Sequence, residues 1–111
     1  MYHKLSEMLS ELEAARSLIY RATEDYMAGR DVTELASMGK FLVGRMAMRI
    51  PAECQQYWGG QGLMSENWIS RAFRDLRLVS IGAGANEVML EVIAKQRGIH
   101  SSSRRNRPGR A

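Results

Sequence analysis

The chain of 111 residues is long enough for one small domain, and its apolar share of 45% and charged share of 25% are ordinary for a folded globular protein. Its one cysteine, Cys54, excludes an intrachain disulfide and a cysteine-rich zinc site, and the chain has no run of about eighteen apolar residues that would span a membrane. The net charge of +4 arises from four arginines in the last eight residues, and the rest holds 12 basic and 12 acidic residues, so we expect a neutral folded body and no nucleic-acid partner.

The first predicted element is an amphipathic helix over residues 2 to about 27. Its apolar residues recur every three or four positions, and its other face is polar. The apolar stripe consists of Leu5, Met8, Leu9, Leu12, Ala15, Ile19, Ala22 and Tyr26. We expect this stripe to pack into the core, with docking of a partner helix as the alternative. The first residues show no N-cap, which indicates a longer architecture, and no signal peptide, which predicts a cytoplasmic protein.

A second helix is predicted from Asp31 towards Tyr57, after a tight turn at Gly29. Asp31 and Glu34 have the spacing of a capping box, in which Asp31 would accept from the first-turn amides and Glu34 would reach back. Such a pair favours a helix that begins directly at this point in the chain.

The second helix is apolar on nearly every side, which predicts that it is the buried, central one. Leu42 and Met46 should therefore be covered by neighbouring helices. Gly39 and Gly44 would let another helix approach closely, because glycine has no Cβ. Pro51 removes a backbone donor and clashes with the preceding turn, so we expect a kink or break near residues 47–50.

Two shorter helices are predicted in the second half of the chain. Residues 65–67 are of the type that caps a helix, and a short helix should follow over about 68–76. Residues 78–81 are expected to form an extended or irregular link. A further helix is predicted from about 86 to 97, ended by Gly98.

Together these elements predict an all-α fold, an up-and-down helical bundle of three to four helices over residues 1–99. Residues 100–111 contain four arginines and almost no apolar side chain, so this segment is predicted to be a disordered basic tail.

Two glycine-rich segments separate the predicted helices, and we call residues 56–62 the first glycine turn and residues 81–87 the second. A helix N-terminus entered through glycines offers free amides to an anionic group such as a pyrophosphate. We interpret the two turns as one paired binding site, with plain helix–helix connections as the alternative. No Gly-Lys-Ser/Thr follows either turn and no strand pattern precedes one, which excludes a Walker loop and disfavours a Rossmann fingerprint.

The residues in and between the two turns form a pattern with a specific order and spacing. The chain has Gln56-x-x-Gly59-Gly60-x-Gly62, then Arg71-x-x-x-Asp75, then Ile81-Gly82-Ala83-Gly84-x-Asn86-Glu87-Val88. This pattern resembles the C-terminal helical domain of the acyl-CoA dehydrogenases, and the likeness extends over about residues 3–99. The Ile-Gly-Ala-Gly run looks most like the isovaleryl-CoA dehydrogenase branch.

The resemblance implies FAD as the cofactor, an acyl-CoA thioester as the substrate, and abstraction of an α-proton coupled to hydride transfer to the flavin. It also implies contacts with the flavin of a neighbouring subunit, in a homo- or hetero-oligomer, from Gln56, Tyr57, Trp58, Gly59 and Gly60. In the same way it implies that the FAD site is lined by Ala85, Asn86 and Glu87. The acyl chain of the substrate would lie near Ala83 and Gly84.

The chain departs from the family's pattern at positions that bear on catalysis. Many members carry the catalytic glutamate where this chain has Ala83, which cannot accept a proton. Other members supply the base from an earlier helix, which would precede Met1. Ala85 replaces the family's threonine and removes a hydroxyl contact. The domains that hold most of the flavin and CoA, and the first helix of this domain, are missing from the sequence.

We therefore expect no catalytic residue in this chain. The predicted function is a C-terminal module that contributes flavin binding and oligomerisation to acyl-CoA dehydrogenation. The alternative is a non-catalytic oligomerisation module or a truncated fragment.

Overall fold

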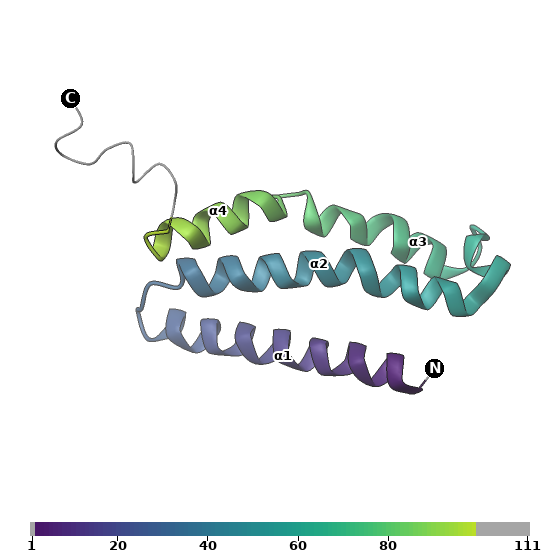
Figure 1. Cartoon of the computed structure of the whole chain (residues 1–111), viewed down its shortest axis with the longest axis horizontal. Coiled ribbons are helices and arrows are strands. Elements are labelled where there is room, and N and C mark those ends of the chain that lie inside the picture. The colour runs from purple at the N-terminus through teal and green to yellow at the C-terminus, as the bar shows by residue number, and fades with distance from the viewer. Residues whose placement is uncertain (1, 100–111) are drawn as a thin grey trace, which may run out of the picture.

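The computed structural model describes residues 2–99, and all of the regular elements within that range are helical (Figure 1). The elements are the helices α1 (Tyr2–Met27), α2 (Thr33–Trp58), α3 (Trp68–Asp75) and α4 (Asn86–Gln96), with the 3₁₀ helices η1 (Gly59–Leu63) and η2 (Leu76–Ser80). The predicted all-α fold class is confirmed. None of the helices in residues 2–99 is long and apolar enough to cross a lipid bilayer.

The helix α2 occupies the centre of the molecule. Figure 1 shows α1 antiparallel to α2 along one side, while α3, η2 and α4 return along the other side. Each of these elements packs directly against α2. The up-and-down arrangement and the central position of the apolar second helix are therefore as the sequence predicts, and they follow from the apolar residues on all faces of α2.

The core is small and lies along α2. The buried apolar residues of the described chain include Met8, Ala15, Met46, Pro51 and Ile69, and Leu42 is half-buried. Met46 is 9% exposed, in agreement with the predicted cover over the middle of α2. By contrast, much of the apolar stripe on α1 stays open, since Leu9 is 62% exposed and Leu12 is 44% exposed.

The start of α2 differs from the predicted capping box. The N-cap position is Val32, which makes no side-chain cap, and the Asp31 carboxylate instead accepts hydrogen bonds from the hydroxyl and the backbone N–H of Thr33. Glu34 does not reach back to Asp31, because its carboxylate pairs with the guanidinium of Arg97 beyond the end of α4. The prediction is therefore right for Asp31, which accepts from the first amide of α2, and wrong for Glu34, whose ion pair with Arg97 takes the place of the contact back to Asp31.

Of the kink or break expected near residues 47–50, the break is absent. Residues 33–58 form one continuous helix that includes Pro51, and this residue is buried. A proline inside a helix removes one backbone hydrogen bond, and α2 is held by packing against its neighbouring elements as well as by its own backbone bonds.

The second half of the chain agrees with prediction apart from one cap and one link. The N-cap residue of α3 is Asn67, but its side chain makes no cap and donates instead to the Gln61 carbonyl oxygen. Residues 78–81 are not extended, because η2 continues α3 as a 3₁₀ helix through Ser80. Gly98 follows the end of α4 with a φ of 74°, the left-handed conformation expected of a helix-terminating glycine. The predicted disordered tail, residues 100–111, lies outside the described residues.

Candidate functional site

The first glycine turn is folded back on the end of α2 by short-range contacts. Gly62 is buried against Gln55, whose Nε2 donates to the Gly62 carbonyl oxygen at 2.6 Å. A Cβ at Gly62 would lie 2.9 Å from the Gln55 carbonyl oxygen, so only glycine fits there without a shift. Asn67, just before α3, donates from Nδ2 to the Gln61 carbonyl oxygen at 2.6 Å. This turn is therefore held by residues within a few positions of itself.

The predicted site residues of the first turn are accessible. Gln56 is exposed, and its side chain forms no hydrogen bond within residues 2–99. Gly59 and Gly60 have open space where a Cβ would stand. Tyr57 is 45% exposed, while Trp58 packs edge to face on Trp68 with 6.2 Å between ring centroids. Trp58 thus has a structural contact and is still 39% exposed.

A shallow pocket of about 180 Å³ lies beside Gln56 and Gly59. Its other walls are Ala52, Gln55 and Leu63. Ligand pockets for drug-sized molecules are larger, on the order of 300–1,000 Å³. The first turn by itself therefore does not form a cavity of that size.

The second glycine turn has an unusual backbone. Ala83 has a φ of 52° and Gly84 a φ of 105°, both in the left-handed region that residues with a Cβ rarely adopt. The side chain of Met89 lies over Gly84, where a Cβ would stand 2.6 Å from the Met89 methyl carbon. The N–H groups of Ile81 and Gly82 both donate to the Leu78 carbonyl oxygen. The turn ends in α4, whose N-cap residue Ala85 offers no side-chain cap.

Two residues of α2, which are far from the second turn in the sequence, contact it directly. Lys40 donates from Nζ to the Val79 carbonyl oxygen and, at 3.3 Å, to the Gly84 carbonyl oxygen. Gly44 is the point of closest approach: a Cβ there would lie 2.3 Å from Asn86 Oδ1 and 3.2 Å from Ser80 Cα. The sequence prediction of close approach at Gly44 is therefore right.

The side-chain carbonyl of Asn86 faces α2 and not the solvent. Its Oδ1 is buried and has no hydrogen-bond partner within the described chain. Glu87, in contrast, is exposed in the first turn of α4. This oxygen is therefore not accessible to a ligand, although Asn86 is the first residue of α4.

The two glycine turns do not meet within one chain. They lie at opposite ends of the segment formed by α3 and η2 (Figure 1). This segment rises by about 20 Å if each residue contributes the usual helical rise. One chain therefore does not form the single paired site suggested by the sequence pattern, and the two turns present separate surfaces.

Lys40 is the residue of this site that sequence reasoning missed. The available signal was one lysine within the apolar run of α2, between Gly39 and Phe41. A charged side chain on a buried helix needs a partner, and here the partners are two backbone carbonyls. Within residues 2–99 there is no cluster of His, Cys, Asp and Glu side chains that would hold a metal ion.

Comparison with known proteins gives a consistent result. Residues 1–97 match the sequence profile described as "Acyl-CoA dehydrogenase, C-terminal domain". The chain is 41% identical over 92 residues to cyclohexane-1-carbonyl-CoA dehydrogenase of Geobacter metallireducens, which covers 83% of this chain and 24% of that protein. Among solved structures it is similar to an acyl-CoA dehydrogenase from Geobacillus kaustophilus, with a TM-score of 0.83 and 38% identity over 86% of this chain and 25% of that one.

Butyryl-CoA dehydrogenase from Megasphaera elsdenii is similar to the same extent, with a TM-score of 0.83 and 34% identity over 86% of this chain and 25% of that one. The chain therefore spans about a quarter of the length of these relatives. The names of the three proteins do not point to the isovaleryl-CoA dehydrogenase branch, and that finer assignment stays a prediction.

Proposed function

The chain belongs to the acyl-CoA dehydrogenase family, whose C-terminal domain it matches, and from this premise we propose that it contributes flavin binding and oligomerisation to the α,β-dehydrogenation of an acyl-CoA thioester. The observation that carries the proposal is the second glycine turn, which leads into the uncapped N-terminus of α4. Free amides at a helix N-terminus bind anionic groups such as a pyrophosphate.

The residues of the two turns fit a flavin cofactor. Ala85 precedes α4 without a side-chain cap, so the first amides of the helix are available to an anion. Gly59 and Gly60 leave open space over the backbone, and the Gln56 amide is free to donate or accept. Bound FAD would supply the hydride acceptor, which no side chain of this chain provides.

The assignment of residues follows from the resemblance and the surfaces described above. Ala85, Asn86 and Glu87 would hold the cofactor at the second turn, with Ala83 and Gly84 beside the acyl chain. The first turn, from Gln56 through Tyr57 and Trp58 to Gly59 and Gly60, would contact the flavin of a neighbouring subunit. The separation of the two turns along α3 and η2 supports this division between two subunits.

Complementation in two pieces would test the proposal. The Geobacter metallireducens relative, cut before the quarter that this chain matches, would be produced with and without this chain. We expect the pair to retain flavin on gel filtration, measured by flavin absorbance, and either piece alone to retain little. Gly60→Leu should reduce that flavin at least about tenfold, because it fills the open space over the turn. An exposed control, Ala28→Leu, should leave the flavin unchanged.

The chain by itself should not dehydrogenate any acyl-CoA. Ala83 has no group that accepts a proton, and a catalytic base must stand within hydrogen-bond reach of the substrate. The measurement is electron-acceptor reduction with short, branched and long acyl-CoAs. Turnover by the isolated chain that disappears in Glu87→Gln would contradict this expectation and assign the base to Glu87.

An open apolar groove between α1 and α2 supports self-association of the chain. Two hollows of about 450 and 430 Å³ share Ile19 and Val43 and form one continuous groove between α1 and α2. The walls of this α1–α2 groove include Leu12, Tyr26, Leu35, Ala47 and Ile50. Open apolar surfaces of this kind drive association, so we expect dimers or larger species, and this favours the non-catalytic oligomerisation module as the second candidate function.

Sedimentation at micromolar concentration would test the association. Leu12→Lys places a charge in the groove and should weaken association about tenfold or more, because a Leu side chain contributes on the order of 1.5–3 kcal/mol when buried. The matched control is Leu90→Lys on α4, which is 47% exposed against 44% for Leu12. A folded monomer of the unaltered chain would contradict the expectation.

A further inference from the structure

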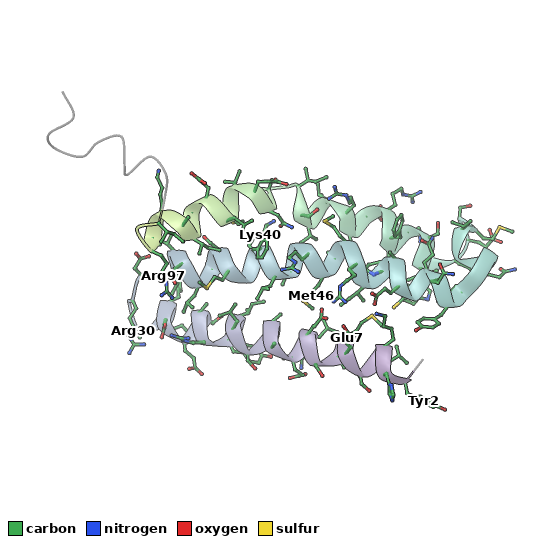
Figure 2. The ribbon with its side chains drawn as sticks, viewed as in Figure 1. Tyr2, Glu7, Arg30, Lys40, Met46 and Arg97 are labelled. Carbon is green, nitrogen blue, oxygen red and sulfur yellow. The ribbon has the colours of Figure 1, made fainter. Side chains whose placement is uncertain are left out.

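We infer that Lys40 is a positioning residue of the second glycine turn and sets the direction of the free amide that this turn presents. Lys40 Nζ donates to the carbonyl oxygen of Val79 at the end of η2 and, at 3.3 Å, to that of Gly84 just before α4. One ammonium group thus restrains both ends of residues 79–84. Figure 2 shows Lys40 on α2, on the side that faces α4.

The turn needs such a restraint because its own residues form few hydrogen bonds that would fix its backbone. Ala83 and Gly84 have φ values of 52° and 105°, and the side chains from Ile81 to Ala85 carry no hydrogen-bonding group. The two backbone bonds to the Leu78 carbonyl oxygen hold the start of the turn and leave its end free. Within residues 2–99, no other side chain from a distant helix donates to this segment.

The geometry of the peptide bond converts this restraint into a direction. A trans peptide unit is planar, and its C=O and N–H groups point in opposite directions. Because the Gly84 carbonyl oxygen faces Lys40 on α2, the N–H of Ala85 in the same plane points away from α2. This N–H donates to no acceptor within the described chain. It is one of the amides that the proposed function offers to the cofactor, and the functional part of the inference rests on that proposal.

Lysine has the properties that this task requires. The half-buried ammonium offers three donors on a flexible stem, and its charge strengthens each hydrogen bond to a carbonyl. A neutral stem of the same length would fill the same space and restrain neither carbonyl. The charge and the packing contribution can therefore be separated by experiment.

Amide hydrogen exchange in the full chain, followed by NMR, is the primary test. Lys40→Met keeps an unbranched stem and a similar helix propensity. We expect exchange to rise about tenfold or more at Gly82 and Met89, whose N–H groups donate to the Leu78 and Ala85 carbonyl oxygens, since two charge-assisted bonds are lost. Exchange in the middle of α1 should stay within about twofold of the unaltered chain. The control Lys95→Met, at the exposed end of α4, should leave all of these rates unchanged.

Chemical rescue separates charge from packing. Lys40→Cys in a Cys54→Ser background, alkylated with 2-bromoethylamine, regains an ammonium at nearly the length of lysine. Protection at Gly82 and Met89 should return with this adduct and not with a neutral propyl adduct. Equal protection from the neutral adduct, or unchanged exchange in Lys40→Met, would overturn the inference.

The flavin measurement distinguishes the inference from the proposed function. In the two-piece assembly, Lys40→Met should retain several-fold less flavin than the unaltered chain, and Lys95→Met should match the unaltered chain. An assembly that holds no flavin with the unaltered chain counts against the proposed function alone, because the exchange rates still decide whether Lys40 positions the turn.

Discussion

The two glycine turns look alike in sequence and are held in different ways. The first is fixed by Gln55 and Asn67, which lie within seven positions of their partners. The second is fixed by Lys40, whose two carbonyl partners are 39 and 44 positions away along the chain, and by the close approach of Asn86 to Gly44. The first turn is therefore held as a local unit, whereas the second has its local backbone bonds completed by contacts from α2.

This difference predicts whether a substitution in each turn affects only local opening or the stability of the whole bundle. Contacts between neighbouring residues can open without disturbing the rest of the molecule, since local and global unfolding have separate free energies. A change under the second turn instead disrupts the α2–α4 interface and affects the stability of the whole bundle. Pairs of glycine substitutions in each region test this contrast.

Gly44→Ala should have the largest effect. The new Cβ would stand 2.3 Å from Asn86 Oδ1 and 3.2 Å from Ser80 Cα, so both the Asn86 side chain and the backbone of η2 must shift. Forcing a methyl group into such a contact costs about 1–3 kcal/mol, and here we expect the upper end of that range. The measurement is the free energy of unfolding in urea at constant protein concentration.

Gly39→Ala is the matched control in the same helix. Its Cβ would meet Ile19 Cγ1 at 3.4 Å, an ordinary contact, and alanine favours a helix by about 1 kcal/mol over glycine. We expect this variant to be as stable as the unaltered chain or more stable. Equal losses in Gly44→Ala and Gly39→Ala would break the proposed contrast, because only Gly44 lies under the second turn.

The close approach at Gly44 also shows what the sequence can and cannot predict. The apolar periodicity of α1 and the all-round apolar surface of α2 suffice to predict two helices and their order of burial, because each is a local property of about 26 residues. Gly44 in a buried helix signals a close neighbour in the same way. The neighbour's identity depends on how η2 returns along α2, and no local pattern contains that information.

Two of the failed predictions have a common cause. The contact from Glu34 back to Asp31 and the break before Pro51 follow from local rules, and the packed bundle overrides both. The Glu34 carboxylate pairs with Arg97, 63 positions along the chain, and Pro51 is buried within a continuous helix. Lys40 was overlooked for the same reason, since its partners are carbonyl groups that a sequence does not place in space.

Gly62→Ala should have an intermediate and local effect. A Cβ there would stand 2.7 Å from Gln55 Cγ and 2.9 Å from the Gln55 carbonyl oxygen, so the turn must move away from α2. We expect exchange to rise at Met64, whose N–H closes the turn, with a loss of about 1 kcal/mol or less in global stability. The control is Gly60→Ala, where nothing lies within 4 Å of the new Cβ. A global loss as large as that of Gly44→Ala would show that the first turn is also part of the main packing.

The connection between α1 and α2 extends the comparison to a third turn, which is held locally like the first and should show the smallest effect. The hydroxyl of Thr33 donates to the Asp31 carboxylate at 2.6 Å and the Thr33 N–H at 3.0 Å, and in that order these bonds lower the pKa of Asp31 from its ordinary value of 3.8. A carboxyl group with a lowered folded-state pKa stabilises the fold above its unfolded pKa and loses that contribution as the pH falls through the folded value.

Asp31→Ala should therefore be slightly less stable than the unaltered chain at pH 7, and the difference should fade below pH 3.8. Thr33→Val removes the hydroxyl donor and keeps the N–H, so it should abolish most of this pH dependence while α2 still begins at residue 33. Urea unfolding across pH 2 to 7 measures both variants, and a difference between Asp31→Ala and the unaltered chain that persists at the acid end would mean that packing, rather than the carboxylate, holds this turn.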